Sequence, residues 1–224
     1  MDKLPVYIAK RYLLLLVGLS IMAFGVAFSI KASLGTSPIS SVPYVVSLFA
    51  PLTVGTATIV MHCVFILLQI LILRRNYHPI QLMQLPVAVF FGYLTDFGVW
   101  AVRGIHCSTY CQQWIVCLIG ILLVAAGVSL EVKAGVVVLA GEDVVLAICK
   151  VLPKIKFGYM KVGFDVTLVV IACILSFTFT GHLQGVREGT VAAALLVGLI
   201  AKQIGKLLMR WKMEGEPEKE ETAG

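Results

Sequence analysis

Six long apolar segments dominate the sequence and limit what this chain can fold into. They run from Tyr12 to Ile30, Val54 to Leu73, Ile80 to Val102, Gln113 to Leu130, Phe157 to Phe179 and Gly189 to Met209. A helix needs about 20 mostly apolar residues to cross the hydrocarbon core of a bilayer. A water-soluble domain could not cover so much apolar surface, because 59% of the residues are hydrophobic and only 13% are charged. The sequence therefore predicts an all-α polytopic membrane protein with six transmembrane helices, surrounded by the lipid bilayer.

The lysines and arginines divide unevenly between the connecting segments. If both termini are cytoplasmic, twelve of these residues lie on the inner side, namely Lys3, Lys10, Arg11, Arg74, Arg75, Lys133, Lys150, Lys154, Lys156, Lys206, Arg210 and Lys212. Three lie on the outer side: Lys31, Arg103 and Arg187. Basic residues favour the cytoplasmic side of membrane proteins, so this distribution predicts that both termini are cytoplasmic. It also accounts for the formal net charge of +6 without a nucleic-acid partner.

The second half of the chain repeats the order of elements found in the first. When the chain is shifted by 102 residues, Gly18 aligns with Gly120 and Gly25 aligns with Gly127. Each half holds three spans, so the second copy would enter the bilayer in the opposite direction, as in the inverted repeats of many secondary transporters. The sequence thus predicts two inverted three-helix repeats with interrupted segments. The alternative is that apolar helices with a few glycines resemble one another by chance.

These features divide the chain into four parts. Residues 1–11 are predicted to form a cytoplasmic N-terminus, residues 12–103 the first three-helix repeat, and residues 113–210 the second. The last part, residues 211–224, is acidic and has no apolar periodicity. Such a composition is typical of a disordered segment, so we predict a disordered cytoplasmic tail.

A polar segment, residues 32–43, interrupts the apolar pattern after the first span. It contains hydroxyl side chains, a glycine and two prolines, which do not form an ordinary membrane helix. Ser37 and Pro38 are typical of the N-cap and first position of a helix, so the sequence predicts a half-helix from Pro38 to about Phe49. Irregular backbone at membrane depth is tolerated only where it is buried in protein or faces a watery cavity.

The start of this half-helix is the candidate binding site. Its free N–H groups would form a partly positive pocket suited to an anion or a polar solute. The candidate binding residues are therefore Thr36, Ser37 and Ser40, with an unknown small polar or anionic solute as ligand. An ordinary surface loop followed by a capped helix is the alternative.

The matching segment of the second half, residues 135–150, carries charges of its own. Glu142 and Asp143 stand where a short helix would begin, and Lys150 stands where it would end. Both signs complement the helix dipole. In this interpretation the two carboxylates cap their own helix, so one half offers an open helix start and the other a neutralised one.

Four ionisable side chains lie within the predicted spans, where a charge is costly. They are His62, Asp96, Asp165 and Lys202. Their positions predict two contacts, His62 with Asp96 and Asp165 with Lys202, on opposite sides of the midplane. In a functional role these side chains would gate a solute path or couple transport to the movement of protons. As structural groups they would hold helices together.

Three motifs resemble those of one group of bacterial membrane proteins. They are Leu34–Pro43 (LGTSPISSVP), Gln84–Asp96 with its QLP and FGY sequences, and Gly185–Thr190 (GVREGT). In these residues the chain is similar to YczE/YyaS/YitT-type proteins and is nearest to the YczE branch. The resemblance implies a multi-pass protein of the bacterial plasma membrane. It implies no substrate and no reaction.

No enzyme signature stands in the sequence. HExxH, the Walker loop, the GxSxG elbow and the glycine-rich dinucleotide fingerprint are all absent, so we expect no enzymatic activity and no cofactor. His106, Cys107 and Cys111 form the one cysteine-containing cluster of the predicted loops. A disulfide between Cys107 and Cys111 could form there if the exterior is oxidising. A metal site would lack a fourth ligand, so no metal is expected.

Two functions remain open on this basis. The first is a small-solute transporter or permease with a midplane site between the repeats, with the three hydroxyl residues binding and the four ionisable residues gating or coupling. The second is a non-transporting accessory or regulatory protein that acts through a partner complex. A homo-oligomer or a membrane partner protein is compatible with either function.

Overall fold

The structure, a computed structural model, describes residues 3–209, and these residues are helical with no strand. The helices are α1 (Lys3–Ala32), α2 (Pro38–Phe49), α3 (Val54–Leu73), α4 (Gln84–Ala101), α5 (Tyr110–Ala134), α6 (Ala140–Val151), α7 (Phe157–Thr180) and α8 (Glu188–Met209). Two 3-10 turns, Arg74–Asn76 and Pro79–Met83, join α3 to α4. Within the described range, six helices are long and apolar enough to cross a membrane: α1, α3, α4, α5, α7 and α8. The predicted all-α fold with six spans is confirmed, and the predicted tail lies outside the described residues.

Local sequence signals set the helix ends. The half-helix α2 runs from Pro38 to Phe49, as predicted, because Ser37 takes the extended N-cap conformation and Pro38 the first helical position. Helix α5 begins with a capping box between Thr109 and Gln112. It continues past the predicted end of its span and stops at Gly135, whose left-handed backbone (φ 55°) closes the helix.

Helices α1 and α5 pack against each other in antiparallel orientation, and glycines make the close approach. A Cβ on Gly25 would lie 2.8 Å from the carbonyl oxygen of Gly120, and a Cβ on Gly120 would lie 2.8 Å from that of Gly25. Gly18 and Gly127 meet in the same reciprocal way farther along the crossing. Small residues allow helix backbones to approach closely in membranes, so this contact depends on the absence of side chains.

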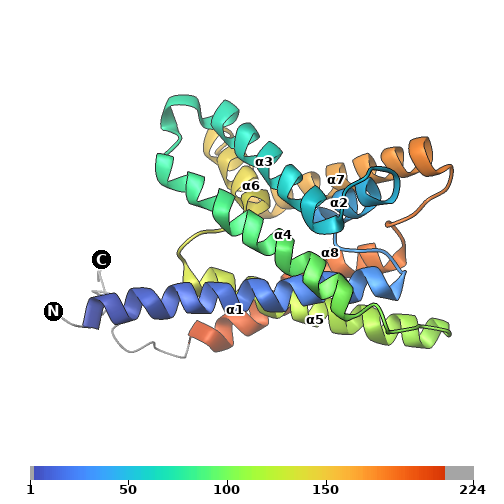
Figure 1. The fold of residues 1–224 in the computed structure, drawn as a ribbon. Coiled ribbons are helices and arrows are strands. Elements are labelled where there is room, and N and C mark those ends of the chain that lie inside the picture. The colour runs from blue at the N-terminus through green and yellow to red at the C-terminus, as the bar shows by residue number, and fades with distance from the viewer. Residues whose placement is uncertain (1–2, 210–224) are drawn as a thin grey trace.

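The other helices surround this central pair. Helix α4 packs against α1, and α8 packs against α5. The short helices cross between the halves, because α2 packs against α7 and α6 packs against α3. In Figure 1 the beginning of α1 and the end of α8 lie at the same end of the molecule, as an even number of spans requires.

Four clusters of buried apolar side chains form the core of the described residues, and two of them contain a buried phenylalanine. One lies between α1, α4 and α5 and includes Leu19, Phe91 and Val124. The other lies between α3, α6 and α7 and includes Phe65 and Leu168.

The linker between α1 and α2 is held by the loop between α7 and α8. The backbone N–H of Thr36 donates to the carbonyl oxygen of Gly185 over 3.2 Å, and that of Gly189 donates to Leu34 over 2.8 Å. Arg187 adds a bond of 3.1 Å from its guanidinium to the carbonyl oxygen of Ser33. Two motifs about 150 residues apart in sequence therefore form one joint, and this joint fixes where α2 begins.

Candidate functional site

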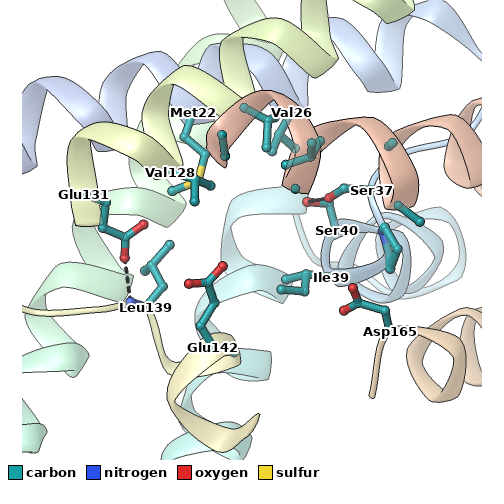
Figure 2. Close-up of a pocket in the computed structure, with 18 of the residues that line it drawn as sticks. Met22, Val26, Ser37, Ile39, Ser40, Val128, Glu131, Leu139, Glu142 and Asp165 are labelled. Carbon is teal, nitrogen blue, oxygen red and sulfur yellow. Dashed lines mark hydrogen bonds between the residues drawn. The ribbon is translucent and has the colours of Figure 1, made fainter. Parts of the chain in front are cut away.

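A cavity of about 200 Å³ lies between the starts of the two short helices, α2 and α6 (Figure 2). Most of its lining is apolar and comes from all eight helices and the residues just before α2 and α6. Its polar lining residues are Ser37, Ser40, His62, Glu131, Glu142, Lys161 and Asp165. A mostly apolar space with a few polar side chains is typical of a small-molecule site.

The α2 side of the cavity presents an uncapped helix start. Ser37 occupies the N-cap, but its side chain makes no capping hydrogen bond. Its hydroxyl instead donates to the Ser40 hydroxyl over 3.0 Å, and both side chains face the cavity in Figure 2. Thr36, the third predicted binding residue, is buried in the linker and is not part of the cavity lining.

The α6 side presents carboxylates. Glu131, near the end of α5 and only 2% exposed, accepts a hydrogen bond of 2.6 Å from the backbone N–H of Leu139, the N-cap of α6. Glu142 lies in the first turn of α6 and lines the cavity. Asp143 turns away and accepts a bond from the side chain of Gln84. Glu142 and Asp143 stand in the first turn of α6, as predicted, but they do not cap their own helix, because the N–H of the N-cap residue Leu139 donates to Glu131 of α5 instead.

Two buried amides fix α6 in this position. Gln69 of α3 donates to the Gln84 side chain over 3.1 Å and to the carbonyl oxygen of Ala140 over 3.0 Å. Gln84 in turn donates to Asp143. Because both amides are buried, these bonds tie the start of α6 firmly to α3 and α4.

The pKa of Glu142 predicts a pH-dependent effect of its substitution. Helix α6 is not one of the spanning helices, and burial raises the pKa of Glu142 above its ordinary 4.5, while Lys161 opposes the shift. A raised folded-state pKa gives stability that is fully present below pH 4.5 and is lost as the pH rises through the folded pKa. We therefore expect Glu142→Gln to raise the melting temperature of detergent-purified protein at pH 8 and to leave it unchanged at pH 4. A difference of the same size at both pH values would contradict this assignment.

The predicted contact between Asp165 and Lys202 is wrong. Asp165 pairs with Lys161, one turn earlier on α7, at 2.7 Å. Lys202 is exposed on α8. A partner four residues away on the same helix is always within reach, whereas a pair between two helices needs both to face each other at the same depth.

The predicted contact between His62 and Asp96 is also wrong. Asp96 lies one turn from the end of α4 and accepts hydrogen bonds from the Thr53 hydroxyl at 2.6 Å and the Gly55 N–H at 2.7 Å. It thus serves the start of α3, where backbone N–H groups have no helical partner. His62 lies deeper in α3, with Phe65 and Phe91 at right angles to its ring.

His62 is the unusual side chain of the cavity. It is 1% exposed, and neither of its ring nitrogens has a hydrogen-bond partner within the described part of the chain. A buried polar group without a partner costs about 1–3 kcal/mol. Such a group calls for an explanation, and a ligand in the cavity that it lines is one.

The capping role of Asp96 predicts a stability effect. Asp96→Ala removes the acceptor for Thr53 and Gly55, whose bonds lie at the exposed to half-buried start of α3. It should lower the free energy of unfolding by about 0.5–2 kcal/mol, the usual cost of losing a helix cap. Asp96→Asn keeps one acceptor oxygen and should lose less. Unfolding in detergent followed by circular dichroism measures both variants. An alanine variant as stable as the parent would show that the cap contributes nothing.

Glu131 is the site residue that sequence reasoning missed. The predicted span ended at Leu130, so the charged residue after it fell into a connecting segment. The repeat held a signal, because a shift of 102 aligns Glu131 with Ser29, and both are buried polar residues. No three His, Cys, Asp or Glu side chains in the described part of the chain are grouped to hold a metal ion. Cys107 and Cys111 are free thiols.

The six long apolar helices are those of a multi-pass integral membrane protein. The chain belongs to a family of unknown function, DUF6198, whose model matches residues 9–206. Nothing in this match links the family by name to YczE/YyaS/YitT proteins, so that resemblance stays a prediction. None of the curated proteins and none of the solved structures matches the chain.

Proposed function

We propose that this protein is a small-solute transporter of the bacterial plasma membrane and that it binds its solute in the cavity between α2 and α6. The observation that carries the proposal is His62, a buried imidazole that lines this cavity and has no hydrogen-bond partner among residues 3–209. Ser37 and Ser40 at the open start of α2 would hold one end of the solute. Asp96 and Lys202 lie outside the cavity lining, so the coupling role falls to the carboxylates that line it.

The helix contacts support an inverted repeat. If α1 to α4 are exchanged with α5 to α8, the contact of α1 with α4 becomes that of α5 with α8, and the contact of α2 with α7 becomes that of α6 with α3. The antiparallel glycine contacts of α1 and α5 exchange with each other in the same way. Transporters with such repeats bind solutes near the midplane at the starts of half-helices.

The contacts of α3 with α4 and of α2 with α8 have no comparable counterpart in the described residues, and the first of them indicates where movement would occur. Helix α3 packs closely against α4, whereas α7 and α8 do not pack closely. On one side the cavity wall is therefore α8, held by α5 and by the joint with the linker. A wall attached in this way can separate from α7 without breaking a packed core, as alternating access requires.

Access from the two sides of the membrane tests the proposal without knowledge of the solute. Ser40→Cys places a thiol in the cavity, and the reagent MTSET, which does not cross membranes, is applied to either side of oriented vesicles. Mass spectrometry of the peptide with residue 40 should show labelling from both sides. Thr95→Cys, at a buried hydroxyl position outside the cavity lining, should stay unlabelled. Labelling of residue 40 from one side only, or from neither, would favour the non-transporting accessory protein.

A further inference from the structure

Acidic side chains outnumber basic ones in the lining of the cavity. Lys161 and Asp165 form an ion pair at 2.7 Å, so they offset each other. Glu131 and Glu142 remain, and within the described residues neither is in an ion pair. Figure 2 shows both side chains beside Leu139, facing the same space. A cation bound at this end would favour the ionised form of both carboxyl groups. This end of the cavity therefore suits a cation, although the open start of α2 alone predicted an anion.

The hydrogen-bond acceptors of the cavity indicate which kind of cation would fit. His62 lies one turn from Phe65 on α3, and a ring carbon of Phe65 lies 3.5 Å from where a Cβ on Gly141 would be, next to Glu142. A neutral imidazole offers one acceptor nitrogen, and an ionised carboxylate offers several acceptor sites. An ammonium group donates three hydrogen bonds and accepts none. Glu131, Glu142 and His62 would provide one acceptor for each of these donors.

The apolar lining and the volume of the cavity limit the polarity and the size of the rest of the solute. Met22, Val26, Val128, Leu139 and Val197 are among the residues that surround the space, so an alkyl body would replace water there. A cavity of about 150 Å³ can hold benzene, and this cavity has about 200 Å³. The solute would thus have roughly six to ten non-hydrogen atoms.

We infer that the cavity binds a small apolar amine whose ammonium group meets Glu131, Glu142 and His62. This inference rests on the proposed function, in which the cavity is the solute site. A carboxylate on the same molecule would reach the uncapped start of α2 near Ser37, so apolar amino acids share the chemistry with simple amines.

Thermal unfolding of the full chain in lipid nanodiscs tests the inference with four matched compounds. Isoamylamine carries the ammonium, isoamyl alcohol is its neutral counterpart, isocaproate is an acid of similar shape, and leucine carries both charges. We expect a saturable rise in melting temperature with isoamylamine and none with the alcohol or the acid. A rise with leucine as well would extend the class to amino acids. A rise with isocaproate alone, or equal rises with the amine and the alcohol, would overturn the inference.

Substitutions of the two cavity glutamates test whether isoamylamine binds in this cavity. Glu131→Gln keeps an acceptor for the Leu139 N–H, so the fold should persist while the charge is lost. This variant and Glu142→Gln should each weaken isoamylamine binding about tenfold or more, because hydrogen bonds to charged groups contribute about 1.5–3 kcal/mol. Glu188→Gln, at an exposed carboxylate paired with Arg187, should bind like the parent. Unchanged binding in both cavity variants would refute the site.

The two proposals fail in different ways. If the amine binds but the thiol of the Ser40→Cys variant is labelled from one side only, transport is refuted and the solute class stands. If that thiol is labelled from both sides but only isocaproate raises the melting temperature, the solute class is refuted and transport stands.

Discussion

Replacing Gly25 with alanine should lower the free energy of unfolding by about 3 kcal/mol or more. The new Cβ would lie 2.6 Å from the backbone nitrogen of Val124 and 2.8 Å from the carbonyl oxygen of Gly120. Both atoms belong to the backbone of α5, so neither can move aside alone. Helices α1 and α5 would have to separate along the contact that joins the two halves. Overpacking costs about 1–3 kcal/mol and sometimes more, and total stabilities are only about 5–15 kcal/mol.

Gly163→Ala is the matched control for this prediction. Gly163 lies within α7, and a Cβ there would meet no other atom within 4 Å. Alanine is favoured over glycine inside a helix by about 1 kcal/mol, so this variant should be at least as stable as the parent. Unfolding in a denaturant series compares the two. The close approach of α1 and α5 would be wrong if the Gly25→Ala variant unfolded at the same denaturant concentration as the parent protein.

Features encoded in neighbouring residues could be predicted from the sequence. The spans depend on the length of an apolar run, and the start of α2 depends on two adjacent residues, Ser37 and Pro38. The structure confirms both. The same reasoning stopped the fourth span at Leu130, because hydropathy falls at Glu131. The helix continues to the left-handed Gly135, since capping determines where a helix ends.

Partners on different helices could not be predicted in this way. Which side chains meet depends on the rotation and depth of each helix, and hydropathy reports neither. His62 and Asp96 lie at different depths, so Asp96 meets the start of α3 instead. The pair of Lys161 with Asp165 could have been predicted, because residues four apart share a helix face.

The joint between the linker and the α7–α8 loop could be predicted only in part. Leu34–Pro43 and Gly185–Thr190 stood out as motifs, but nothing in the sequence shows that they touch. The structure explains why both are distinctive. Each provides backbone groups to the other through Thr36, Gly185, Leu34 and Gly189. A joint of this kind needs specific residues on both segments of the chain, and the cavity depends on it because α2 starts there.

Gly35→Ala tests this joint and should lower both the melting temperature and the affinity for the solute. Gly35 has a φ of 95°, and a Cβ there would collide with the Thr190 hydroxyl and lie 2.7 Å from the Arg187 nitrogen. Gly181→Ala is the matched control, because Gly181 also has a positive φ (75°) but a Cβ there meets nothing within 4 Å. The control variant should lose only the stability that a left-handed backbone conformation costs an alanine, about 1–2 kcal/mol. Gly35→Ala adds a collision of about 1–3 kcal/mol and displaces the start of α2 from the cavity. Melting temperatures and isoamylamine binding of the two variants separate these effects, and equal losses in both would mean that the α7–α8 loop does not hold the linker.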